Sequence, residues 1–123
     1  VYAVSVAGGD LQDQVTLGLL LNAIDFGMAP AQAVTAPRFA TSLHEDSFDP
    51  NPDRLQTIPP ARLTINSTID AGVRQELTRR GHELEVKEGN IGVPVMLRVD
   101  PDSGLLRAAG DPAAGRHADG LGE

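Results

Sequence analysis

Apolar residues recur along the chain with two different periods, and each period predicts an element. Val1–Ala7 is mostly apolar and β-branched and runs into Gly8-Gly9, which predicts a buried strand. The segment Leu11–Phe26 has helical spacing, with one face formed by Leu17, Leu20, Leu21 and Ile24. Three further positions widen this apolar surface to nearly every side: Leu11, Val15 and Leu19. We therefore expect this helix to be buried between two layers.

The middle of the chain predicts a helix, a strand and a long loop. Pro30 suits the first turn of a short helix, which Pro37 ends. Arg38–Leu43 is interpreted as a strand, which closes a first segment of residues 1–43. Residues 44–61 carry four prolines and many acidic and polar side chains, which predicts an extended surface loop.

Residues 62–110 predict a strand, a helix and three more strands. A strand at 62–65 is followed by Ser67–Asp70, which is close to a capping box and predicts a helix to about Arg80. Strands are expected at 82–88, 93–99 and 105–109, as antiparallel hairpin strands. Residues 111–123 are rich in glycine, alanine and aspartate and predict a loose tail. The fold class is therefore α+β.

Composition narrows the range of partners. The 123 residues include 10 basic and 17 acidic side chains, for a net charge of −7. An acidic chain without a basic cluster makes nucleic acid an improbable partner. No apolar run is long enough for a membrane span. The absence of cysteine excludes disulfides and thiol chemistry within these residues.

Gly8-Gly9-Asp10 joins the first strand directly to the first helix. Asp10 suits the N-cap of that helix, and the helix end carries unpaired backbone N–H groups and partial positive charge. Two glycines allow another group to approach the backbone closely. The junction could hold a carboxylate, a phosphate or a developing oxyanion, or it could be only a tight turn. The glycine spacing does not match a nucleotide-binding loop.

Other candidate residues are weaker. Arg38 follows Pro37 beside apolar residues, which indicates either a structural ion pair or a carboxylate-binding residue. The stretch Asp49–Asp53 imitates the start of a calcium loop but lacks its later ligands. The three histidines are scattered. We therefore predict no metal site and no cofactor.

Several stretches of the chain resemble the C-terminal part of γ-glutamyltranspeptidases. They are Gly8–Gln14, Leu21–Met28 and Ala33–Phe39, followed in the family's order and spacing by Arg80–Leu84, Asp100–Gly104 and Ala109–Pro112. The resemblance covers essentially the whole chain and implies part of an N-terminal-nucleophile hydrolase, a four-layer αββα sandwich. In that family, a threonine that heads the small subunit attacks the γ-glutamyl amide. The family's glycine pair, matched by Gly8 and Gly9, supplies the oxyanion-hole N–H groups.

The chain also departs from the family pattern. Asp10 stands where the family has serine, Ala40 where it has histidine, and Ala113 where it has arginine. The nucleophile and the residues that hold the substrate's α-amino and α-carboxylate groups lie upstream of this segment in the family. The departures leave open a related amide or β-lactam-type acylase, and the missing nucleophile leaves open a non-catalytic binding module.

We interpret residues 1–123 as the C-terminal segment of a γ-glutamyltranspeptidase-like small subunit, since the sequence starts within a strand and without methionine. Its expected partners are the remainder of the small subunit, the large subunit and an amide substrate. Asp10 and Arg38 are assigned structural roles. We expect the isolated chain to be inactive, because it lacks a nucleophile, and to self-associate through uncovered apolar surface.

Overall fold

The computed structural model describes residues 1–119 of the chain. These residues form two compact units. The first unit consists of Val1–Ala36 together with the chain from Gly92 onward, and the second consists of Pro37–Ile91. The second unit is therefore an insertion in the sequence of the first.

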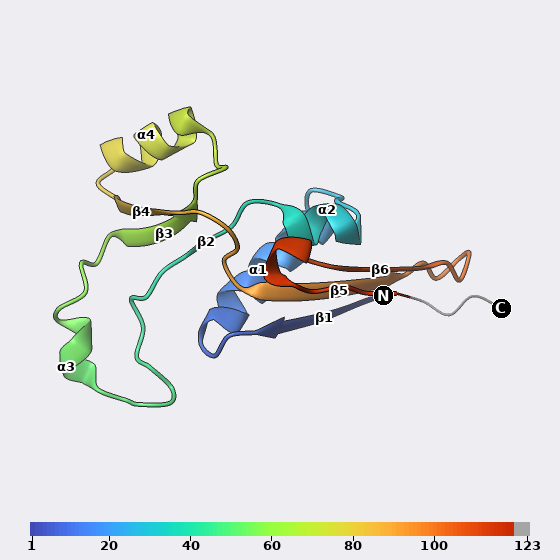
Figure 1. The fold of residues 1–123 in the computed structure, drawn as a ribbon, viewed down its shortest axis with the longest axis horizontal. Coiled ribbons are helices and arrows are strands. Elements are labelled where there is room, and N and C mark those ends of the chain that lie inside the picture. The colour runs from blue at the N-terminus through green and yellow to red at the C-terminus, as the bar shows by residue number, and fades with distance from the viewer. Residues whose placement is uncertain (120–123) are drawn as a thin grey trace. The chain divides into compact units, whose positions relative to one another are not determined.

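The first unit is an antiparallel sheet with two helices on one side (Figure 1). Strand β1 (Tyr2–Ala7) pairs with β5 (Val93–Val99), which pairs with β6 (Leu106–Gly110). Helix α1 (Leu11–Ile24) packs on β1, and α2 (Pro30–Thr35) packs on β5 and β6. The predicted strands and helices of this unit are confirmed, with ends shifted by up to two residues.

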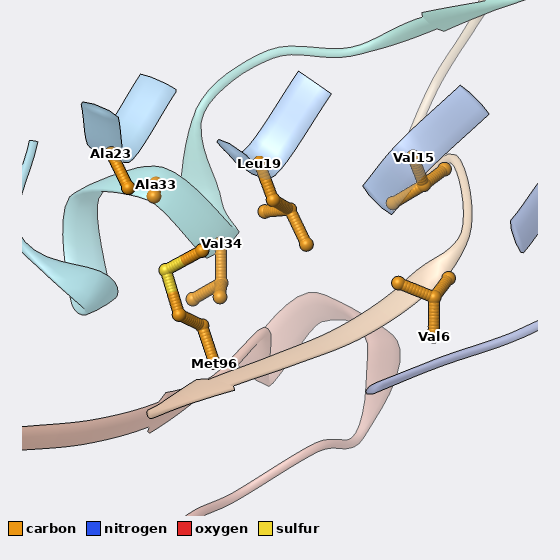
Figure 2. Packing of buried hydrophobic residues seen from close by; sticks show 7 residues of the cluster. All are labelled: Val6, Val15, Leu19, Ala23, Ala33, Val34 and Met96. Carbon is orange, nitrogen blue, oxygen red and sulfur yellow. The ribbon is translucent and has the colours of Figure 1, made fainter. Parts of the chain in front are cut away.

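The core of the first unit lies between the helices and the sheet (Figure 2). Side chains of α1 point toward those of the strands and of α2; the buried cluster is Val6, Val15, Leu19, Ala23, Ala33, Val34 and Met96. The sequence predicts a helix that is buried between two layers, whereas residues 1–119 bury only one face of α1. Leu17 is 59% exposed and Ile24 61%, while Val15 and Leu19 are nearly inaccessible. Only one side of α1 is covered by the described residues, so one of its apolar faces stays open.

The side of this sheet that faces away from the helices is also apolar. Alternation along the paired strands assigns it ten residues: Ala3, Ser5, Ala7, Val93, Val95, Leu97, Val99, Leu106, Ala108 and Gly110. None of these residues is charged, and Ala3, Ser5 and Ala7 are exposed. A sheet face that contacts water normally carries polar side chains at these positions.

The second unit holds a mixed sheet in the order β2-β3-β4. Strand β3 (Arg62–Asn66) pairs antiparallel with β2 (Phe39–Ala40) and parallel with β4 (Glu83–Lys87). The prediction that the last three strands form antiparallel hairpins is therefore wrong for β4. Helix α4 (Ala71–Arg79) carries the chain back across the sheet, which makes the two strands parallel.

Two local predictions in the second unit also need correction. The strand expected over 38–43 shortens to Phe39–Ala40, and the surface loop contains a short helix, α3 (Pro52–Leu55). Helix α4 starts after Asp70 rather than at Ser67. The Asp70 Oδ1 accepts hydrogen bonds from the N–H groups of Gly72 and Val73 at 2.8 and 3.2 Å, so it satisfies the first turn directly.

The chain after β6 is ordered against the first unit. Residues Pro112–Ala114 form the single-turn helix η1, and the buried Asp111 accepts from Ala113 N–H at 3.0 Å. A Cβ on Gly110 would lie 2.6 Å from the Arg116 carbonyl carbon, which shows how closely the chain returns. The predicted loose tail is wrong for this part, and its last four residues lie outside the described residues.

Candidate functional site

The Gly8-Gly9 pair forms the tight junction between β1 and α1. Both glycines have positive φ, +139° and +59°, which favours glycine over any residue with a Cβ. The Gly8 carbonyl accepts from Leu11 N–H at 3.2 Å, and the Gly9 carbonyl accepts from Gln12 N–H at 3.0 Å. The carbonyls are thus turned into the first turn of the helix, which fixes the orientation of the adjoining peptide planes.

The N–H groups of Gly8 and Gly9 remain available. Among residues 1–119, no acceptor is found for either N–H group. They lie at the N-terminal end of a helix of 14 residues, where the backbone dipoles favour negative charge. Two adjacent donors with fixed direction can bind a carbonyl oxygen and stabilise the negative charge that develops on it.

The predicted N-cap position of Asp10 is confirmed, but its side chain does not form the expected cap. It occupies the N-cap position of α1 with helical angles, φ −64° and ψ −12°, and its side chain makes no capping hydrogen bond. A capping side chain needs extended angles to reach back to the second or third N–H group. The acidic residue in the first turn of α1 is Asp13, which is favourably placed beside the helix dipole.

Arg38 lies in the second unit and is 8% exposed. Its Nε donates to the Ile91 carbonyl at 2.6 Å, and its backbone is bound to Asn66. These contacts hold the Arg38 backbone and its Nε within the second unit, and both roles predicted for Arg38 stay predictions.

Two buried polar residues were missed by the sequence reasoning. Asn66 is 6% exposed, and its amide binds backbone groups on two other segments. Asp111 is 3% exposed and organises the turn after β6. The Asp111-Pro112 pair is a recognisable turn signal, whereas nothing in the pattern around Asn66 distinguishes it from an exposed strand end.

The groups whose pKa values are shifted belong to exposed ion pairs and to an exposed turn. Hydrogen bonds to Arg79 and Arg80 lower the pKa of Glu76, and the hydrogen bond to Glu83 raises the pKa of Arg62. In the part of the chain that the structure describes, no three histidine or acidic side chains gather as metal ligands. No helix within residues 1–119 has the length and apolar character to cross a membrane.

The sequence of residues 1–121 matches the gamma-glutamyltranspeptidase family. The match covers nearly the whole chain, so the chain belongs to the gamma-glutamyltranspeptidase family. No curated protein matches it.

Solved structures show the same relationship. A variant of gamma-glutamyltranspeptidase from Helicobacter pylori is 26% identical, with a TM-score of 0.69 over 91% of this chain and 53% of that one. Cephalosporin acylase from Bacillus halodurans is 27% identical, with a TM-score of 0.75 over 98% of this chain and 20% of that one. Gamma-glutamyltranspeptidase from Pseudomonas nitroreducens, at 22% identity and a TM-score of 0.70, shares the fold over 99% of this chain. The chain spans about half the length of the matched transpeptidase chains, 53% and 54%.

Proposed function

We propose that this chain is the C-terminal part of the small subunit of a γ-glutamyltranspeptidase-like enzyme and supplies its oxyanion hole. The observation that carries the proposal is the Gly8-Gly9 junction: two adjacent glycines at positive φ with available N–H groups, at the start of α1, in a chain of this family. The nucleophile, a threonine in our proposal, is supplied by the polypeptide upstream of Val1.

In the proposed reaction, the threonine hydroxyl attacks the carbonyl carbon of a γ-glutamyl amide. The carbonyl oxygen gains negative charge as its double bond opens, and the N–H groups of Gly8 and Gly9 donate to it. Collapse of this intermediate expels the amine, which takes the proton lost by the hydroxyl, and leaves an ester on the threonine. Water or the amine of an amino acid then attacks the ester carbonyl carbon, the bond to the threonine oxygen breaks, and that oxygen takes the proton lost by the attacking group, which frees the acyl product as an acid or a new amide.

The apolar face of the first unit's sheet, on the side away from α1 and α2, supports an αββα architecture for the complete enzyme. A face with no charge among ten positions suits burial against a second sheet better than contact with water. With α1 and α2 on the other side, a second sheet with its own helices would complete an αββα sandwich. We propose that the rest of the enzyme supplies those two layers.

A related amide acylase is the second candidate. It is favoured by the similarity to cephalosporin acylase over 98% of this chain, and by Asp10, Ala40 and Ala113 at the positions that depart from the transpeptidase pattern. The two candidates share the same oxyanion hole and differ in the acyl group.

Turnover of matched substrates by the complete enzyme separates the candidates. A γ-glutamyl anilide and a glutaryl anilide differ only in the α-amino group of the acyl part. A transpeptidase should favour the γ-glutamyl substrate strongly, and an acylase should favour the glutaryl one. If the complete enzyme cleaves neither substrate nor any cephalosporin side chain, the proposed function is wrong.

A further inference from the structure

Three side chains form a row across the sheet of the first unit. Tyr2 on β1 pairs with Arg98 on β5, which pairs with Arg107 on β6. The central guanidinium carbon of Arg98 lies 5.7 Å from the centroid of the Tyr2 ring, a cation–π contact that holds this side chain over β1. Arg107 is exposed.

Arg98 and Arg107 occupy directly opposite positions on β5 and β6, and no carboxylate is paired with either within the described residues. Like charges directly opposite each other destabilise a sheet. Across residues 1–119, neither Arg98 nor Arg107 forms an ion pair. The chain carries 17 acidic residues, so this unpaired positive pair contrasts with its overall charge of −7.

Asp100, whose pKa is lowered in part by the charge of Arg98, is engaged in the turn after β5. The Asp100 Oδ1 accepts from the N–H groups of Asp102 and Ser103, each at 3.0 Å. These bonds, with the Gly104 N–H donating to the Asp100 carbonyl at 2.9 Å, define the turn between β5 and β6. The turn therefore fixes the register that places Arg98 opposite Arg107, while Asp100 attracts Arg98 without forming an ion pair with it.

We propose that Arg98 and Arg107 bind a carboxylate side chain of the polypeptide that completes the enzyme outside this chain. Guanidinium groups bind carboxylates through paired N–H donors, and two of them on adjacent strands present such donors from a fixed sheet. The inference rests on the proposed function, because the transpeptidase chains that match extend well beyond the 53% that this chain spans. A carboxylate at this position would convert a repulsive pair into a charge-paired contact.

The test compares thermal unfolding of the complete enzyme with that of its Arg107→Gln and Arg98→Gln variants at low and high salt. We expect both substitutions to lower the Tm by a few degrees in dilute sodium chloride, and the difference to shrink at high salt because charge interactions are screened. Arg107→Lys, which keeps the charge and loses the planar donor group, should fall in between. The control Arg74→Gln removes one positive charge from α4, where no opposing arginine or ion pair is found in the described chain, and should leave the Tm unchanged.

The direction of the Tm change tests the proposal. If no carboxylate binds the pair, Arg107→Gln relieves repulsion, and an unchanged or raised Tm overturns the proposal. If the variants differ from the wild type only in phosphate buffer, the pair binds a free oxyanion, and the proposal of a polypeptide carboxylate is wrong. Turnover of the anilide substrates is measured on the same preparations. If the enzyme is active but the Tm does not respond to the arginine substitutions, this inference is wrong and the proposed function stands.

Discussion

Arg38 and Asn66 are joined by a reciprocal pair of hydrogen bonds. The Arg38 N–H donates to the Asn66 Oδ1 at 2.7 Å, and the Asn66 N–H donates to the Arg38 carbonyl at 3.0 Å. The Asn66 Nδ2 then donates to the Gly89 carbonyl at 2.7 Å. One buried amide thus ties the start of the second unit to the end of β3 and to the segment after β4.

Replacing Asn66 with alanine should lower the free energy of unfolding by about 1–3 kcal/mol, since the buried Arg38 N–H loses its acceptor and a buried group left without a partner costs about that much. Denaturant unfolding of the purified protein measures the loss. Asn51→Ala is the matched control, because the exposed Asn51 caps only the short helix α3. Equal effects of the two substitutions would contradict the structural role of Asn66.

Asn66-Ser67-Thr68 also matches the acceptor sequence for N-glycosylation. Because Asn66 is 6% exposed and its Nδ2 donates to the Gly89 carbonyl, a glycan at this position is incompatible with the fold. Secretion from a glycosylating host should therefore yield little folded protein. Thr68→Ala, which removes the acceptor sequence at an exposed residue, should restore the yield, whereas Thr68→Ser should not. A folded glycoform with normal stability would refute this prediction.

Gly9→Val in the complete enzyme should reduce turnover by about a hundredfold or more. Valine keeps its backbone N–H, but a Cβ at positive φ should tilt the peptide and misdirect this donor or block the substrate carbonyl, and loss of one oxyanion donor costs ~3 kcal/mol in the transition state. Ground-state binding should change less, since the charge on the oxygen is then undeveloped. Gly27→Val is the control: Gly27 also has positive φ, +66°, and a Cβ there would meet no other atom.

The two variants separate strain from catalysis. Both should lower the Tm, because a β-branched side chain tolerates positive φ poorly. Only Gly9→Val should reduce turnover per folded molecule. Normal turnover by a destabilised Gly9→Val enzyme would mean that the glycine pair is only a turn.

Gly92→Ala should destabilise the protein more than Gly104→Ala. Both glycines have similar positive φ, +76° and +69°, but a Cβ on Gly92 would lie 2.8 Å from Val15 Cγ2, whereas one on Gly104 would meet nothing. Overpacking of this kind costs about 1–3 kcal/mol beyond the shared backbone strain. Adding Val15→Ala to Gly92→Ala should recover part of the loss, as a double-mutant cycle by denaturant unfolding would show.

The pKa of Asp100 should lie below its ordinary value near 3.8 because the Ser103 N–H and hydroxyl and the Asp102 N–H stabilise its carboxylate. A lowered pKa in the folded state means that the group stabilises the fold above its unfolded pKa and loses this contribution as pH falls through the folded value. Titration of the carboxyl carbon by NMR measures it. Ser103→Ala should raise the pKa part of the way by removing the hydroxyl, and Ser67→Ala should leave it unchanged.

Sequence patterns predicted most elements but misjudged how they pair. The strand–glycine–helix junction and the strand at 93–99 follow from local signals and are confirmed. The parallel pairing of β3 with β4 depends on long-range contacts that no local pattern carries. Apolar residues lie on nearly every side of α1, so periodicity could not predict that Val15 is buried and Leu17 exposed. The close approach of Gly92 to Val15 depends on tertiary packing, which no local pattern predicts.

The insertion of the second unit sets an order for folding. Strand β1 is synthesised well before its pairing partner β5, because Tyr2 lies opposite Arg98, which is 96 positions later in the sequence. The residues of the second unit, by contrast, are contiguous from Pro37 to Ile91 and are all available before β5 is complete. Because pairings between distant segments form slowly, β1 and the apolar helix α1 stay exposed until β5 has been synthesised. This part of the enzyme is therefore most vulnerable to aggregation before residue 99 is made, and chaperone binding during translation should concentrate on the segment of β1 and α1.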